Sequence, residues 1–112
     1  MVLKDLAVWQ RSARLSTNLY KALAELRDCG FRDQITRFGL SIPGNIAEEY
    51  GTGMGKELVQ FLRYVKGSAA ELETQIYIGM ENGYIDREQG KLWAQEASKI
   101  QAMLGELIKA KS

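Results

Sequence analysis

Hydrophobic side chains recur along this chain at alternating steps of three and four residues, which places them on one face of an α-helix. The pattern predicts helices over residues 5–27, 31–50 and 56–82, and another from residue 86 onward. No stretch alternates between apolar and polar residues as a half-buried strand does. The predicted core positions are Val8, Ser12, Leu15, Leu19, Ala22, Leu26; Phe31, Ile35, Phe38, Ile42, Ile46; Leu58, Phe61, Leu62, Val65, Ala69, Leu72, Ile76, Met80; and Trp93, Ala97, Ile100, Met103, Leu104, Leu107, Ile108.

Short connections between four amphipathic helices favour an all-α fold, an antiparallel up-and-down four-helix bundle in which residues 1–112 form a single domain. The second helix contains Pro43, which removes one backbone hydrogen bond and crowds the carbonyl of Gly39. Because apolar spacing resumes at Ile46, we predict one helix kinked near Pro43, with a division into two short helices as the alternative. The glycine-rich residues 51–55 predict a loop, and the lack of a following Gly-Lys-Ser or Gly-Lys-Thr indicates a connector rather than a phosphate cradle.

Charge and cysteine content restrict the environment of the protein. The 15 basic and 14 acidic residues give a net charge of +1, so any attraction to nucleic acid must come from a local patch. No apolar run is long enough to span a membrane, and the first residues do not read as a secretory signal. The single cysteine, Cys29, has no intrachain disulfide partner, so we expect a cytoplasmic protein with no membrane contact.

The residue types needed for catalysis are scarce. With no histidine, the chain has no Ser-His-Asp or Cys-His system and no histidine general base, and most zinc sites are excluded. An all-carboxylate metal site is the alternative, and solvated glutamates are the simpler interpretation of its candidates. We therefore predict no catalytic residues, no cofactor, no metal site and no enzymatic activity. The candidate carboxylates are Glu48, Glu49, Glu71 and Glu73.

Two sets of polar residues indicate candidate binding or assembly sites. The first set occupies helical positions predicted to face the core, where it would form a hydrogen-bonded network. Such a network either fixes helix register and subunit assembly or binds a ligand or partner. The set consists of Gln34, Ser41, Asn45 and Glu48 on the second helix and Ser68 and Gln75 on the third.

The second set is basic and lies near tyrosines such as Tyr20 and Tyr64. Cations beside aromatic rings hold phosphates and stack bases in nucleic-acid-binding proteins. A solvated charged face is the alternative. The candidate nucleic-acid-binding residues are Arg11, Arg14, Lys21, Arg37, Lys56, Arg63 and Lys66.

Four segments together resemble a known bacterial family, the four-helix-bundle 23S ribosomal RNA intervening-sequence proteins. Residues 41–48 read Ser-Ile-Pro-Gly-Asn-Ile-Ala-Glu, and residues 67–74 read Gly-Ser-Ala-Ala-Glu-Leu-Glu-Thr. The other two segments are residues 6–10 and 33–35. The resemblance implies a homopentamer with no catalytic residues. A more distant similarity to accessory variability proteins of diversity-generating retroelements implies binding of RNA or DNA and of a reverse-transcriptase-like protein.

Taken together, the sequence favours a non-enzymatic, homo-oligomeric helical scaffold that binds nucleic acid, a protein partner or both. The alternative is a protein-interaction or assembly module that binds no nucleic acid. Wide apolar faces carrying Trp9, Tyr20, Phe61 and Trp93 lead us to expect that some of these rings line subunit contacts.

Overall fold

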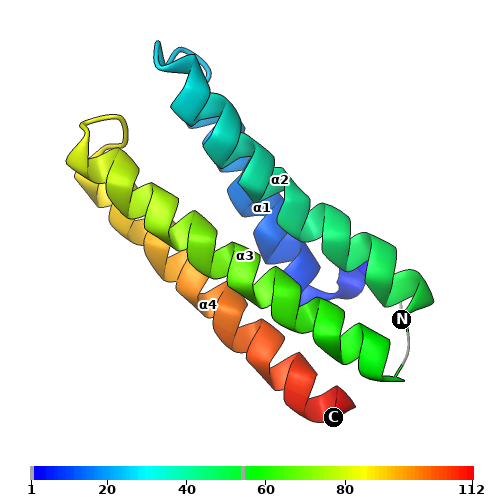
Figure 1. Ribbon diagram of the computed structural model, residues 1–112. Helices are drawn as coiled ribbons and strands as arrows, with labels where there is room; N and C mark the ends of the chain where they lie inside the picture. The colour runs from blue at the N-terminus through cyan, green and yellow to red at the C-terminus, as the bar shows by residue number, and fades with distance from the viewer. Residues whose placement is uncertain (1, 54) are drawn as a thin grey trace.

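Four long helices run back and forth along one axis in the computed structural model of the protein, which describes residues 2–53 and 55–112 (Figure 1). A short 3-10 turn, η1 (Leu3–Asp5), precedes α1 (Ala7–Ala22), α2 (Cys29–Thr52), α3 (Gly55–Glu81) and α4 (Arg87–Lys111). No strand occurs in these two described ranges. The predicted all-α bundle is confirmed.

The helices form two hairpins, α1 with α2 and α3 with α4, that pack side by side (Figure 1). Among the pairs of long helices that touch in the described chain, contact is most extensive between α3 and α4 and least extensive between α1 and α4. Helix α2 lies beside α3. Helix α4 therefore borders α3 on one side and α1 on the other.

The core follows the predicted apolar stripes closely. Burying a Leu, Ile or Val side chain fully contributes roughly 1.5–3 kcal/mol, so these residues account for most of the hydrophobic stabilisation. Ala22, at the end of α1, is exposed, and Leu26, Phe31 and Phe38 are half-buried against the core. Among the predicted residues, those no more than 5% exposed include Val8, Leu15, Leu19, Ile35, Ile42, Ile46, Leu62, Val65, Leu72, Ile76, Trp93, Ala97, Ile100 and Leu104.

Helix α1 ends at Ala22, so the prediction of a helix reaching residue 27 is wrong. Leu23 is still buried and Leu26 half-buried in the following turn, which is why their spacing resembles a continued helix. Asp28 stops that continuation, because its side chain caps α2 by accepting a hydrogen bond from the Phe31 N–H (3.0 Å).

Helix α2 runs uninterrupted through Pro43 to Thr52, so the alternative of two short helices is wrong. The predicted loop over residues 51–55 is also too long, because α2 continues into it and α3 begins at Gly55. Met54 lies outside the described residues. Gly55 adopts φ +64°, a left-handed conformation that glycine reaches without steric cost.

The two turns at the opposite end of the bundle are tied together. The hydroxyl of Tyr84, in the α3–α4 turn, donates to Asp28 (2.8 Å), and its ring lies 5.2 Å from that of Phe31. Asp86 caps α4 by accepting from the Gln89 N–H (3.1 Å). This turn end is held by specific side-chain contacts.

Candidate interaction surfaces

The seven predicted nucleic-acid-binding cations do not form one surface. Arg63 and Lys66 line a groove between α3 and α4, whereas Arg11 and Arg14 line a different groove between α1 and α4. The remaining three are exposed on α1, α2 and α3: Lys21, Arg37 and Lys56. The two grooves are therefore the places where the predicted cations come together.

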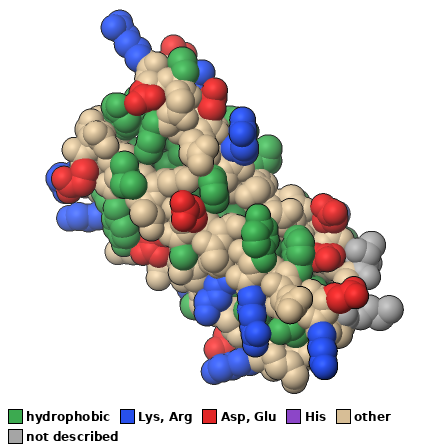
Figure 2. Space-filling view, in the orientation of Figure 1, with side chains coloured by type: hydrophobic (Ala, Val, Ile, Leu, Met, Phe, Trp, Pro, Cys, Tyr) green, Lys and Arg blue, Asp and Glu red, His purple; other side chains and the backbone are tan. Residues whose placement is uncertain are grey.

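The groove between α3 and α4, here called the basic groove, has a volume of about 770 Å³. Arg63, Lys66 and Lys109 line it, and none of them makes an ion pair with a described residue. Glu106 is the carboxylate among its lining residues. Figure 2 shows Lys and Arg gathering over this end of the molecule, where the first half of α3 lies beside the last half of α4.

The lining of the basic groove includes four small residues, Gly67 and Ala70 from α3 with Ala102 and Gly105 from α4. Lys109 is absent from the predicted set because it lies far along the chain from Arg63. The heptad spacing of α3 and α4, combined with their antiparallel packing, is the signal that would have placed it opposite the α3 cations.

Arg11 occupies a different electrostatic environment. Its guanidinium donates two hydrogen bonds to Glu96, from Nε (3.0 Å) and from Nη2 (2.9 Å). These bonds and the charge of Glu96 raise the pKa of Arg11 above its usual value. Arg11 therefore ties α1 to α4 through an ion pair within the chain. Arg14, on the same groove, makes no ion pair with the part of the chain that the structure describes.

The predicted polar core network is wrong for most of its members. Gln34 and Glu48 are exposed, and Ser41, Asn45 and Ser68 are half-buried. Gln75 alone among the six is buried. The physical reason is that α2 turns Ile35, Ile42 and Ile46 to the core, so that the polar residues fall on the flank of the helix.

Ser41 and Ser68 bond to their own helices instead of to each other. The Ser41 hydroxyl donates to the Phe38 carbonyl (2.7 Å), and the Ser68 hydroxyl donates to the Tyr64 carbonyl (3.3 Å). The Gln75 Oε1 atom has no hydrogen-bond partner among the described residues. The interface between α2 and α3 thus contains polar groups, but no hydrogen-bonded network joins Ser41, Ser68 and Gln75.

A second hollow, here called the α2–α3 hollow, lies across α3 from the basic groove. Its lining includes two aromatic residues, Phe38 and Tyr64, together with Ser68 and Glu71, and its volume is about 360 Å³. Tyr64 is 63% exposed, and its ring centroid lies 6.1 Å from that of Phe61. The remaining lining residues are Arg63 and Gly67, which also line the basic groove.

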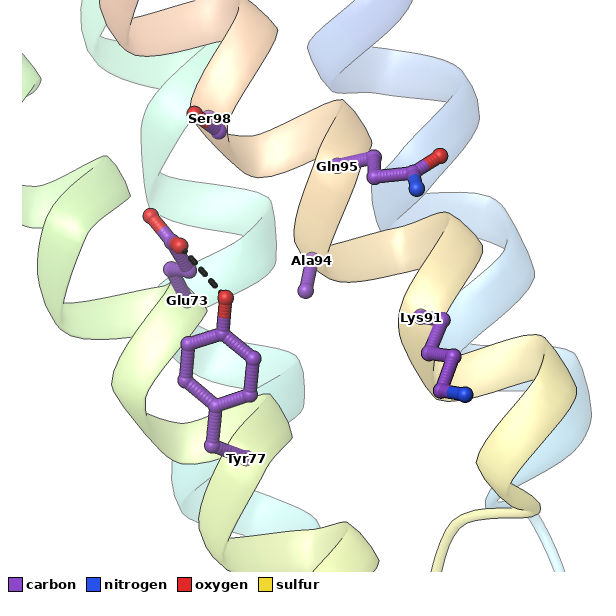
Figure 3. A pocket seen from close by; sticks show the side chains of 6 residues that line it. All are labelled: Glu73, Tyr77, Lys91, Ala94, Gln95 and Ser98. Carbon is purple, nitrogen blue, oxygen red and sulfur yellow. Dashed lines mark hydrogen bonds between the residues drawn. The ribbon is translucent and has the colours of Figure 1, made fainter.

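Nearer the turn end, α3 and α4 form another groove, in which the acidic side chain is already bonded (Figure 3). The Tyr77 hydroxyl donates to Glu73 (2.8 Å), and the Gln101 amide donates to the other oxygen of Glu73 (2.6 Å). The bond to Glu73 raises the pKa of Tyr77. Within residues 2–53 and 55–112, no three acidic, cysteine or histidine side chains gather as a metal site would require.

The four aromatic residues considered for subunit contacts have different surroundings. Trp93 is 5% exposed and belongs to the core, so it is not on the surface of the chain. Trp9 and Phe61 are half-buried and pack against that core. Tyr20 remains 46% exposed on α1. Of the four, Tyr20 retains the greatest exposure for a contact outside the chain.

Comparison with known proteins identifies the family. None of the described helices is long and apolar enough to cross a bilayer. A search of curated proteins finds no match. A family model described as 23S rRNA-intervening sequence protein matches residues 4–106, which contain all four helices up to the last residues of α4. The four-helix bundle and this match agree with the resemblance of residues 41–48 and 67–74, and the chain belongs to the 23S rRNA-intervening sequence protein family.

Proposed function

We propose that this chain is a non-enzymatic helical scaffold that assembles into a homo-oligomer and binds RNA through the basic groove. The observation that carries the proposal is the convergence of Arg63, Lys66 and Lys109 on one groove without an ion pair to any described residue. Cations held close together repel one another, and a polyanion that binds them offsets this repulsion.

The titrating groups support a structural role rather than catalysis. The groups with shifted pKa values are Arg11, Asp28, Tyr77 and Tyr84, and each shift follows from hydrogen bonds that hold the fold. Catalytic sites instead gather perturbed groups in one cleft. Asp28 and Tyr84 bond to each other between the two turns, whereas Arg11 and Tyr77 each bond a glutamate elsewhere, so the four groups do not share one cleft.

The outer face of α2 supports self-assembly. No charged residue occurs between positions 38 and 47, although α2 is partly exposed there and Leu40 is 53% exposed. A second copy of the chain would cover this face. Assembly would repeat the basic groove on every subunit, so that a long RNA meets many cations without a high charge per chain. The proposed subunit number is five, which follows from the family resemblance; light scattering tests it.

The nucleic-acid part is tested by charge reversal. The paired substitution Arg63→Glu and Lys66→Glu should weaken binding of a structured RNA about tenfold or more in a gel shift at low salt. The control is Lys91→Glu with Lys99→Glu, which changes the net charge equally on exposed residues of α4 outside the basic groove. An equal loss of RNA affinity in both variants, or no RNA binding by the unmodified protein even at low ionic strength, would contradict the nucleic-acid part of the proposal. Only the self-assembly part would then remain.

A further inference from the structure

We infer that the nucleic acid held by this protein is an unpaired strand that crosses α3 at Gly67, with its phosphates in the basic groove and one base stacked on Tyr64. The inference rests on the proposed function and names the form of nucleic acid that this surface accepts. It follows from the position of the basic groove and the α2–α3 hollow on opposite sides of the same short segment of α3.

Tyr64 is suited to stacking because its ring is presented to solvent and supported from one side. It is the most exposed of the large hydrophobic residues in the described chain, at 63%, and no described residue bonds its hydroxyl. Phe61 lies behind it with ring centroids 6.1 Å apart. Tyr77, by contrast, is bonded to Glu73. An exposed ring next to cations is the arrangement that single-strand-binding proteins use for bases.

Gly67 forms a low point between the two hollows, and it lines both. A Cβ atom added at Gly67 would meet nothing within 4 Å, so packing inside the chain does not require glycine there. Glycine inside a helix costs about 1 kcal/mol relative to alanine. The missing side chain leaves the α3 backbone open where a strand would pass from Lys66 on one side to Tyr64 on the other.

The charges on the two sides of α3 determine which side takes the phosphates and which side takes the base. Arg63 lines both sides. The basic groove adds Lys66 and Lys109 against one carboxylate, that of Glu106, whereas the α2–α3 hollow adds only the carboxylate of Glu71 beside Tyr64. Phosphates are therefore attracted more strongly to the first side than to the second. A base is compatible with the second side, because a carboxylate accepts hydrogen bonds from exocyclic amino groups such as that of cytosine.

A duplex does not satisfy both sides at once. Its bases are stacked on one another inside the helix, so it offers phosphates and sugars to Tyr64 rather than a free base face. Unpaired loops and ends of a folded RNA do offer such a face. The surface therefore selects unpaired nucleotides within a structured RNA.

The test measures fluorescence anisotropy of a labelled RNA of about 12 nucleotides, within the size that one single-strand site covers. Tyr64→Ala should weaken binding of unpaired RNA roughly five- to hundredfold and leave a hairpin duplex of equal length almost unchanged. Tyr64→Phe should retain binding. Tyr77→Ala is the matched control, because Tyr77 is 48% exposed on the same helix and lines neither hollow.

A second variant, Gly67→Gln, should reduce binding of unpaired RNA by filling the crossing point, and thermal melting confirms that each variant is folded. The inference is overturned if Tyr64→Ala binds like the unmodified protein, if the duplex loses as much affinity as the unpaired RNA, or if polyglutamate competes as well as RNA. If Arg63→Glu with Lys66→Glu abolishes binding while Tyr64→Ala does not weaken it, the proposed function stands and this inference fails. If no RNA binds at low salt, both fail.

Discussion

The two ends of the bundle are built in different ways. At the turn end, Asp28 bonds both the start of α2 and the hydroxyl of Tyr84, and Phe31 packs against the Tyr84 ring. At the basic end, the first half of α3 and the last half of α4 border a groove lined by cations and small residues (Figure 2). The contrast teaches that side-chain contacts close one end of this small bundle, while the other leaves its charges available to a ligand.

Two glycines of α3 show the same contrast at single positions. A Cβ atom at Gly79 would lie 2.5 Å from Ile85 Cδ1 and 3.0 Å from Phe31 Cζ, so glycine is needed for the close packing of the turn end. A Cβ atom at Gly67 would meet nothing within 4 Å. Gly79 is required for close packing of the fold, whereas Gly67 leaves part of the α3 surface uncovered.

The largest expected difference between the ends concerns apolar side chains. Ile85→Ala should lower the free energy of unfolding by about 2–5 kcal/mol, because Ile85 is 4% exposed and fills the space above Gly79. Ile108→Ala should cost roughly 1 kcal/mol, because Ile108 is half-buried beside the basic groove. Urea unfolding measures both; equal losses would remove the distinction between the ends.

The same substitution at the two glycines should act in opposite directions. Gly79→Ala should destabilise the protein by about 1–3 kcal/mol through overpacking against Ile85 and Phe31. Gly67→Ala should stabilise it by about 1 kcal/mol, because alanine favours the helix and no atom opposes the added methyl group. Thermal unfolding of the two variants gives the signs, and a loss of stability in Gly67→Ala would contradict this account.

The smallest expected effect is the pH dependence of the turn end. The hydrogen bond from the Phe31 N–H and then that from Tyr84 lower the pKa of Asp28, so its stabilising contribution is present above about pH 4 and is lost as pH falls through the lowered pKa. The pKa of Tyr84 is raised by the bond to Asp28, so its contribution is present below about pH 10 and is lost as pH rises through the raised pKa.

Melting temperatures across this pH range should therefore fall at both extremes. Asp28→Asn keeps a capping oxygen but does not titrate there, so it should flatten the acid fall, and Tyr84→Phe should flatten the alkaline fall. Parallel pH profiles for the variants and the unmodified protein would show that this contact contributes nothing to the closure of the turn end.

The sequence predicts the helices better than it predicts their surfaces. Apolar spacing places both ends of α3 and the start of α4 within a residue or two of their observed positions, because packing against a core imposes that spacing. It overextends α1, since Leu23 and Leu26 remain packed in a non-helical turn. It also assigns Gln34 to the core, because a position on the flank of a helix differs from a core position by only a fraction of a turn.

The candidate site depends on contacts that local sequence does not contain. The partners Arg11 and Glu96 are 85 residues apart, and their contact holds one cation of the predicted set in an ion pair within the chain. Lys109 joins Arg63 and Lys66 only because α3 and α4 pack antiparallel in one register. Charge identity is visible in the sequence, whereas the neutralisation or convergence of charges is decided by packing.

The most direct test of the account is the salt dependence of RNA binding by the unmodified protein and by the triple variant Arg63→Gln, Lys66→Gln, Lys109→Gln. Each phosphate contact to unpaired RNA contributes about 0.7 to the slope of log K against log salt concentration, so the variant should bind more weakly with a slope about 2 units smaller in magnitude. Unchanged affinity and an unchanged slope would show that the basic groove does not hold phosphates.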